Sequence, residues 1–86
     1  MQRDFFKADV LVFPLARTVE VPRMARFLLV VHGEGAQKYY VKRCRELAKR
    51  MRAAGLSDTE IWRQIADFQD AVQISLSDMA AREATA

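Results

Sequence analysis

The chain has 86 residues and a mass of 9.9 kDa, which leaves room for one small domain and no second one. Apolar residues make up 51% of it and charged residues 29%, and three Gly and two Pro allow few turns. A disulfide scaffold, a coenzyme-binding α/β fold, a membrane-spanning protein and a disordered tail are therefore disfavoured. The composition favours a few long helices in a single domain over residues 1–86.

Residues 1–17 are expected to form an extended arm before a three-helix core at 18–86. The β-branched run Asp9–Phe13, closed by Pro14, is typical of one strand. Such a strand needs a partner for its backbone groups: a second copy of the chain, another protein or a later segment. Alternatively, the run lies across the helices without pairing. The arm supplies five candidate partner-binding residues: Val10, Val12, Phe13, Leu15 and Arg17.

A first, short helix is expected over Glu20–Val31, with Gly33 and Gly35 ending it. Its apolar residues recur at helical spacing and would share one face; they are Met24, Phe27, Leu28 and Val31. The run 26–32 is also compatible with a strand that pairs with Asp9–Phe13.

The second helix is expected over Ala36–Ala54, with Gly55 as its left-handed cap. Its apolar stripe spans an arc of about 120°, the width of a face that meets a core. The stripe consists of Tyr40, Val41, Cys44, Leu47, Ala48 and Met51. The single cysteine has no partner for an intrachain disulfide, and we interpret it as a buried structural thiol in a reducing, cytoplasmic compartment.

A third helix begins at a predicted capping box formed by Ser57 and Glu60, and it continues without Gly or Pro to about Ala81. Its apolar face is narrower, about 80°: Ile61, Ile65, Phe68, Val72, Leu76 and Met79. The short link 55–57 predicts an antiparallel helical hairpin with the second helix. A hydrophobic core of this size contributes little stability on its own, so we also expect a homodimer.

Charge is divided unevenly between the two long helices. Residues 36–54 carry seven basic and one acidic group, net +6, whereas residues 55–86 carry two basic and six acidic groups, net −4. Five cations of the second helix form a stripe about 21 Å long, here called the basic stripe: Lys38, Lys42, Arg45, Lys49 and Arg52.

Three interpretations of the basic stripe stay open. It could pair with acidic residues of the third helix and set the register of the hairpin or of a dimer, follow the phosphates of a nucleic acid, or bind an acidic protein. The acidic candidates for the first interpretation are Glu60, Asp67, Asp70 and Asp78.

Residues suited to catalysis do not cluster in the sequence. His32 beside Gly33 is typical of a turn, and Cys44 within an apolar stripe is a poor nucleophile. We expect no enzyme activity, no metal site and no cofactor, because there is no zinc-type Cys/His spacing and no phosphate-binding loop. Trp62 lies at the edge of its helix's apolar face, either as core margin or dimer contact or as an anchor for another protein.

The run VLVFPLAR (Val10–Arg17) followed by a helical hairpin resembles an uncharacterised family of small helical proteins from alphaproteobacteria, their phages and plasmids. The matching parts are Asp9–Arg17 and about Gln37–Leu76, where RMRAAGLSDTEIWRQI is similar to the family's turn. This resemblance implies a mobile-element context and no catalytic residues. We predict a cytoplasmic, non-catalytic regulator or adaptor that binds another protein or a second copy of itself and no membrane. The alternative is a nucleic-acid-binding transcriptional regulator that uses the basic stripe.

Overall fold

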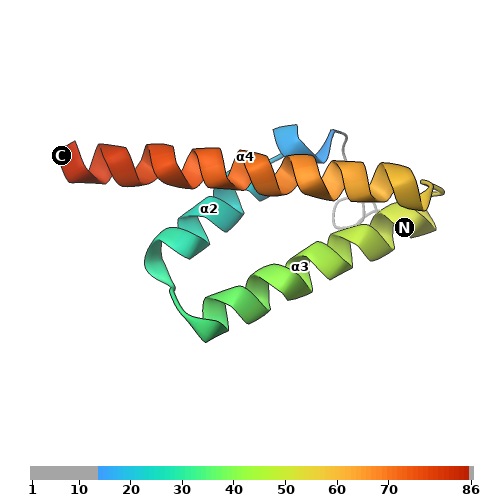
Figure 1. Cartoon of the computed structure of the whole chain (residues 1–86), viewed down its shortest axis with the longest axis horizontal. Coiled ribbons are helices and arrows are strands. Elements are labelled where there is room, and N and C mark those ends of the chain that lie inside the picture. The colour runs from blue at the N-terminus through green and yellow to red at the C-terminus, as the bar shows by residue number, and fades with distance from the viewer. Residues whose placement is uncertain (1–13, 86) are drawn as a thin grey trace, which may run out of the picture.

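Helices account for most of the structure. The computed structural model describes residues 14–85, which form one short helix and three α-helices (Figure 1). Their bounds are Leu15–Arg17 for the 3-10 helix η1, Glu20–Val30 for α2, Glu34–Ala53 for α3 and Asp58–Thr85 for α4. No strand occurs in this range, so the predicted all-helical class is confirmed there and 26–32 is not a strand. The Asp9–Phe13 run lies outside the described residues.

Glycine explains two of the helix boundaries. Gly33 and Gly55 have φ angles of 85° and 98°, a backbone region that favours residues without a Cβ atom. Gly33 lies between α2 and α3, and His32 lies in the same link, as predicted. Gly35 was expected to end an element but lies inside the first turn of α3. α4 continues to Thr85, further than predicted.

The turn after α3 has the hydrogen bonds of a Schellman motif. The N–H of Leu56 donates to the carbonyl of Met51 at 3.1 Å, and the N–H of Gly55 donates to the carbonyl of Arg52 at 3.0 Å. Leu56 also packs against the core cluster. The predicted left-handed cap is confirmed.

The predicted capping box of α4 is half formed. The Oγ atom of Ser57 accepts the N–H of Glu60 at 3.2 Å, which caps the helix. The Glu60 carboxylate accepts hydrogen bonds from Arg63 and Gln64, so it is directed along α4.

The core is built around α4, which packs more extensively against α2 and η1 than against α3. The buried cluster takes residues from all four helices: Leu15, Val21, Met24, Leu47, Met51, Ile61, Ile65, Phe68 and Val72. Near the C-terminal end of α4, Leu76 and Met79 are only half buried.

The prediction that Leu15 belongs to an arm and faces a partner is corrected by the structure. Its side chain is fully buried in the chain's own core, because η1 packs against both α4 and α2. Its N–H donates to Oε1 of Gln64 at 2.9 Å, and Gln64 is itself only 5% exposed. This buried amide satisfies a backbone donor that the core would otherwise leave unpaired.

α3 and α4 meet at the Gly55 turn and separate with distance from it, and α2 leads from the middle of α4 to the start of α3 (Figure 1). An ion pair between Arg43 and Glu20 ties α3 to α2. The Arg43 guanidinium donates to both carboxylate oxygens of Glu20, at 3.2 and 2.6 Å, and to Glu46 at 3.1 Å. The pKa of Arg43 is raised, mainly by its hydrogen bonds to Glu20. The Phe27 and Tyr39 rings, with centroids 4.2 Å apart, add a second contact between α2 and α3, and Leu47 and Met51 anchor α3 in the core.

Candidate functional site: an apolar groove beside a cationic helix face

An apolar groove of about 250 Å³ lies between α3 and α4. The α3 side is lined by Gln37, Tyr40, Val41, Cys44, Arg45 and Ala48, and the α4 side by Trp62, Ile65 and Gln69. Only Leu47 and Met51 of the predicted apolar stripe of α3 are fully buried. The groove follows from the divergence of the two helices, which leaves the rest of that stripe partly uncovered.

Trp62 lies at the edge of this groove. Its side chain is 65% exposed, so it is not a margin of the chain's own core. It remains a candidate anchor for a second copy or for another protein, since exposed aromatic residues beside grooves often carry binding energy. Arg17 is exposed at the end of η1 and does not line the groove. The other predicted partner-binding residues, Val10, Val12 and Phe13, lie outside the described residues.

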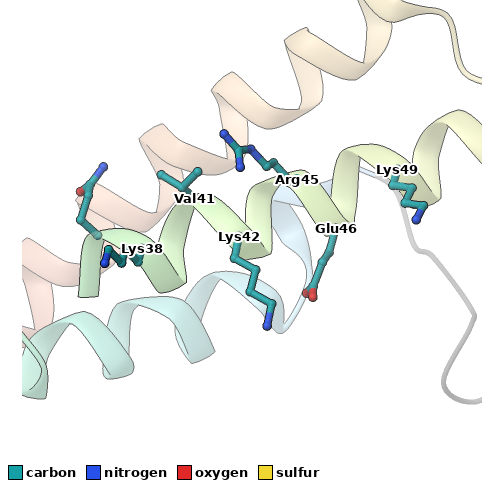
Figure 2. A pocket seen from close by; sticks show the side chains of 7 residues that line it. Lys38, Val41, Lys42, Arg45, Glu46 and Lys49 are labelled. Carbon is teal, nitrogen blue, oxygen red and sulfur yellow. The ribbon is translucent and has the colours of Figure 1, made fainter. Parts of the chain in front are cut away.

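The basic stripe follows the outer face of α3. Figure 2 shows Val41 and Arg45 on one side of the α3 ribbon and Lys42 and Glu46 on the other. They line an open surface hollow of about 610 Å³ that also includes Gln37, Lys38 and Lys49. Arg45 and Val41 line both this hollow and the groove, so the two surfaces are continuous.

The cations of the basic stripe differ in their partners. Lys38 pairs with Glu34 of its own helix at 3.7 Å, and Arg52 pairs with Asp58 at the start of α4 at 3.1 Å. The three central cations have no carboxylate within ion-pair distance among residues 14–85: Lys42, Arg45 and Lys49.

Three acidic side chains of α4 are paired along their own helix. Arg63 binds Glu60 at 2.6 Å and Asp67 at 3.3 Å, and Arg82 binds Asp78 at 2.8 Å. The pKa of Glu60 is lowered, mainly by the hydrogen bond that it accepts from Arg63. The interpretation that α4 neutralises the basic stripe within one chain is therefore wrong, except for the single contact at the turn.

Two of the groups that line the groove have shifted pKa values, Tyr40 and Cys44. Burial, with smaller effects from Cys44 and Asp70, raises the pKa of Tyr40 to about 12. Burial also raises the pKa of the Cys44 thiol, although the Gln69 amide, 3.8 Å from its sulfur, acts in the opposite direction. The thiolate is disfavoured, so Cys44 is a poor nucleophile. Cys44 is half buried, not fully buried as predicted.

Within the described part of the chain, no group of three or more His, Cys, Asp or Glu side chains is placed to hold a metal ion. Among the same residues, no helix combines the length and apolarity needed to cross a membrane.

The groove was not predicted from the sequence as a site. Ile65 was assigned to the core, and Gln37, Ala48 and Gln69 were given no role in binding. One signal was available: the apolar stripe of the second helix is about 120° wide and that of the third about 80°. The wider stripe cannot be covered by the narrower one, and its uncovered edge forms the α3 side of the groove.

These features define a small all-helical protein with an apolar groove beside a cationic face. The family model of DUF6074, a family of unknown function, matches residues 7–86, so the chain belongs to this family. The expectation of an uncharacterised family is thereby confirmed. No curated protein and no solved structure matches the chain.

Proposed function

We propose that the chain is a non-catalytic adaptor or regulator that binds another protein through the α3–α4 groove. The observation that carries this proposal is the exposed Trp62 at the edge of an apolar groove. Protein interfaces concentrate their binding energy in a few aromatic and Arg side chains that surround or fill apolar pockets. The groove offers both, because Arg45 forms part of its α3 side.

In this proposal α3 and α4 act as an antiparallel hairpin whose open side receives the ligand. The groove has few groups suited to chemistry, since raised pKa values keep Cys44 and Tyr40 protonated at neutral pH. A binding role needs neither group to ionise.

The proposal is tested by capture of proteins from a lysate of the organism that carries the gene. The baits are the wild-type chain, Trp62→Ser and, as a matched control, Ile74→Ser, because Ile74 is 71% exposed on α4 and does not line the groove. We expect a protein that the wild type and Ile74→Ser retain and Trp62→Ser loses. Equal capture by all three baits would contradict the proposal.

The second candidate function is nucleic-acid binding through the basic stripe. It is favoured by the absence of any ion pair within residues 14–85 for Lys42, Arg45 and Lys49. Cations that follow phosphates release counterions, so such binding weakens steeply as salt rises. Anisotropy of labelled mixed-sequence duplex DNA at low and physiological salt separates the two functions. Micromolar, salt-sensitive binding that Arg45→Glu/Lys49→Glu abolishes would support this candidate, and no binding at low salt would exclude it.

Three further parts of the proposal concern the setting of the protein. We propose a cytoplasmic location and a regulatory role connected with phages or plasmids, as the resemblance of the FPLAR region implies. Homodimerisation belongs to the proposal because the core is small. Sedimentation at several protein concentrations tests the last of these directly.

A further inference from the structure

The shape of the groove limits what can occupy it. Its α3 side extends from Gln37 to Ala48, which is about 16 Å along the helix axis at 1.5 Å per residue. A helix of about three turns matches this length, and helices bind such grooves through apolar residues at positions i, i+3, i+4 and i+7. The lining side chains come from α3 and α4, and a volume of about 250 Å³ has room for a few apolar side chains of such a helix.

The charge beside the groove limits the occupant further. Arg45 lines the groove, and Lys42 and Lys49 line the hollow that continues from it along α3. None of the three has a carboxylate partner in the described chain, and they span about 10 Å along the helix. A ligand with carboxylates on the flank that meets α3 would pair with them. A basic or neutral ligand would leave three like charges beside its own surface.

A second copy of the chain is a poor match for these cations. Its acidic helix is α4, where Glu60, Asp67 and Asp78 are already paired with arginines of the same helix. To reach the three cations, those carboxylates would first have to give up their own partners. Among the other acids of described α4, Asp58 pairs with Arg52, which leaves Asp70 and Glu83.

We infer that the groove binds an acidic amphipathic helix of a different protein. The ligand's apolar face meets the α3–α4 groove beside Trp62, and its acidic flank meets Lys42, Arg45 and Lys49. This inference rests on the proposed function and specifies its partner.

The test uses a displayed library of randomised peptides of about 14 residues, enough for three helical turns, selected on the full chain. Labelled synthetic copies of the selected peptides are then titrated by anisotropy. We expect sequences with net negative charge, apolar residues at helical spacing, and binding that weakens with added salt. Selected peptides that are neutral or basic would overturn the inference.

Two pairs of variants assign the binding surface. Trp62→Ser is matched by Ile74→Ser, and Arg45→Glu/Lys49→Glu is matched by Arg23→Glu/Arg26→Glu, which makes the same change in net charge on exposed residues of α2. We expect each groove variant to weaken the selected peptides about tenfold or more, and each control about twofold or less. Circular dichroism melting curves of all four variants verify that the fold is kept.

The outcomes separate this inference from the proposed function. Binding that depends on Trp62 but not on Arg45 and Lys49 overturns the acidic ligand and leaves groove binding in place. Binding that neither groove variant weakens overturns both. A concentration-dependent dimer that Trp62→Ser dissociates would place a second copy in the groove and overturn the inference. Displacement of the peptides by duplex DNA at equimolar amounts would assign the surface to nucleic acid and overturn it too.

Discussion

The two sides of α4 differ in how much of their apolar surface the chain itself covers. On one side, η1 and α2 bury Leu15, Val21 and Met24 against it, and Gln64 satisfies a buried backbone donor. On the other side, α3 meets α4 at the Gly55 turn and then diverges, so Val41 and Cys44 stay partly exposed in a groove.

Under the proposed function, one helix serves stability on one side and binding on the other. The side closed by η1 and α2 is the more extensively packed of the two, and burial of apolar surface is the main favourable contribution to folding. The side of α4 that faces α3 is covered less completely by the chain itself, so its uncovered apolar surface is accessible to a ligand. The following predictions compare the two sides, from the largest expected effect to the smallest.

Leu15→Ala should be far more costly than Val41→Ala. Leu15 is fully buried, so its truncation leaves a cavity and should lower the free energy of unfolding by about 2–4 kcal/mol. Val41 is partly exposed at the groove, and its truncation should cost about 1 kcal/mol or less. Urea unfolding of the two variants measures the difference. Equal costs would show that the two sides of α4 are packed alike.

Glu20→Gln should weaken the attachment of α3 to α2. It removes a charge from a bidentate pair whose side chains are only 20% and 23% exposed, so we expect a loss of about 1–2 kcal/mol in urea unfolding. Glu34→Gln is the matched control, since its pair with Lys38 is highly exposed and should contribute about 0.5 kcal/mol or less. A loss no larger than that of the control would mean that this pair does not hold α3.

Two glycine substitutions should change the stability of the fold in opposite directions. Gly55→Ala forces a side chain into a positive-φ turn, at a cost of about 1–2 kcal/mol, and should lower the melting temperature by about 4–8 °C for each kcal/mol. Gly35→Ala lies in the first turn of α3 with nothing near the added Cβ atom, and should gain up to about 1 kcal/mol. Melting curves followed by circular dichroism compare them. A neutral Gly55→Ala would show that the positive φ angle at this turn costs a side chain nothing.

Alkaline pH should affect the groove side through Tyr40. Its pKa is about 12 in the folded chain, against about 10 for a solvent-exposed tyrosine, so the native state keeps a proton that the unfolded state loses between these values. The contribution of Tyr40 to stability is therefore complete below about pH 10 and is lost as the pH rises toward 12. Absorbance titration in a Tyr39→Phe background, where Tyr40 is the remaining tyrosine, should place its ionisation near pH 12. An ionisation near pH 10 would mean that the groove leaves this phenol fully hydrated.

Local signals in the sequence predicted the helices well. The Gly55 cap, the Ser57 cap and the apolar spacing of α4 depend on neighbouring residues, which the sequence shows directly. The contacts of Leu15 and Glu20 depend on where distant helices pack, and no local pattern specifies that. Leu15 was therefore misassigned to an arm, and the pairing of Glu20 with Arg43 was not predicted.

The candidate site was predicted only in part for the same reason. The positions of the basic stripe and of Trp62 follow from helical spacing. Whether α4 neutralises the stripe depends on the angle between the helices and on competing partners such as Arg63, which binds two of the predicted acids. The unequal widths of the two apolar stripes indicate an uncovered surface, but the position of the groove depends on the divergence of α3 and α4, which those widths do not specify.

The position of Trp62 gives the protein a built-in optical signal. It is the single tryptophan of the chain, and 65% of its surface meets solvent at the edge of the groove. The emission of an indole shifts to shorter wavelength when water around it is replaced by apolar groups. Binding of a ligand in the groove should therefore shift the emission maximum of Trp62 to shorter wavelength. This shift can be measured on the unlabelled protein, without a dye attached near the groove.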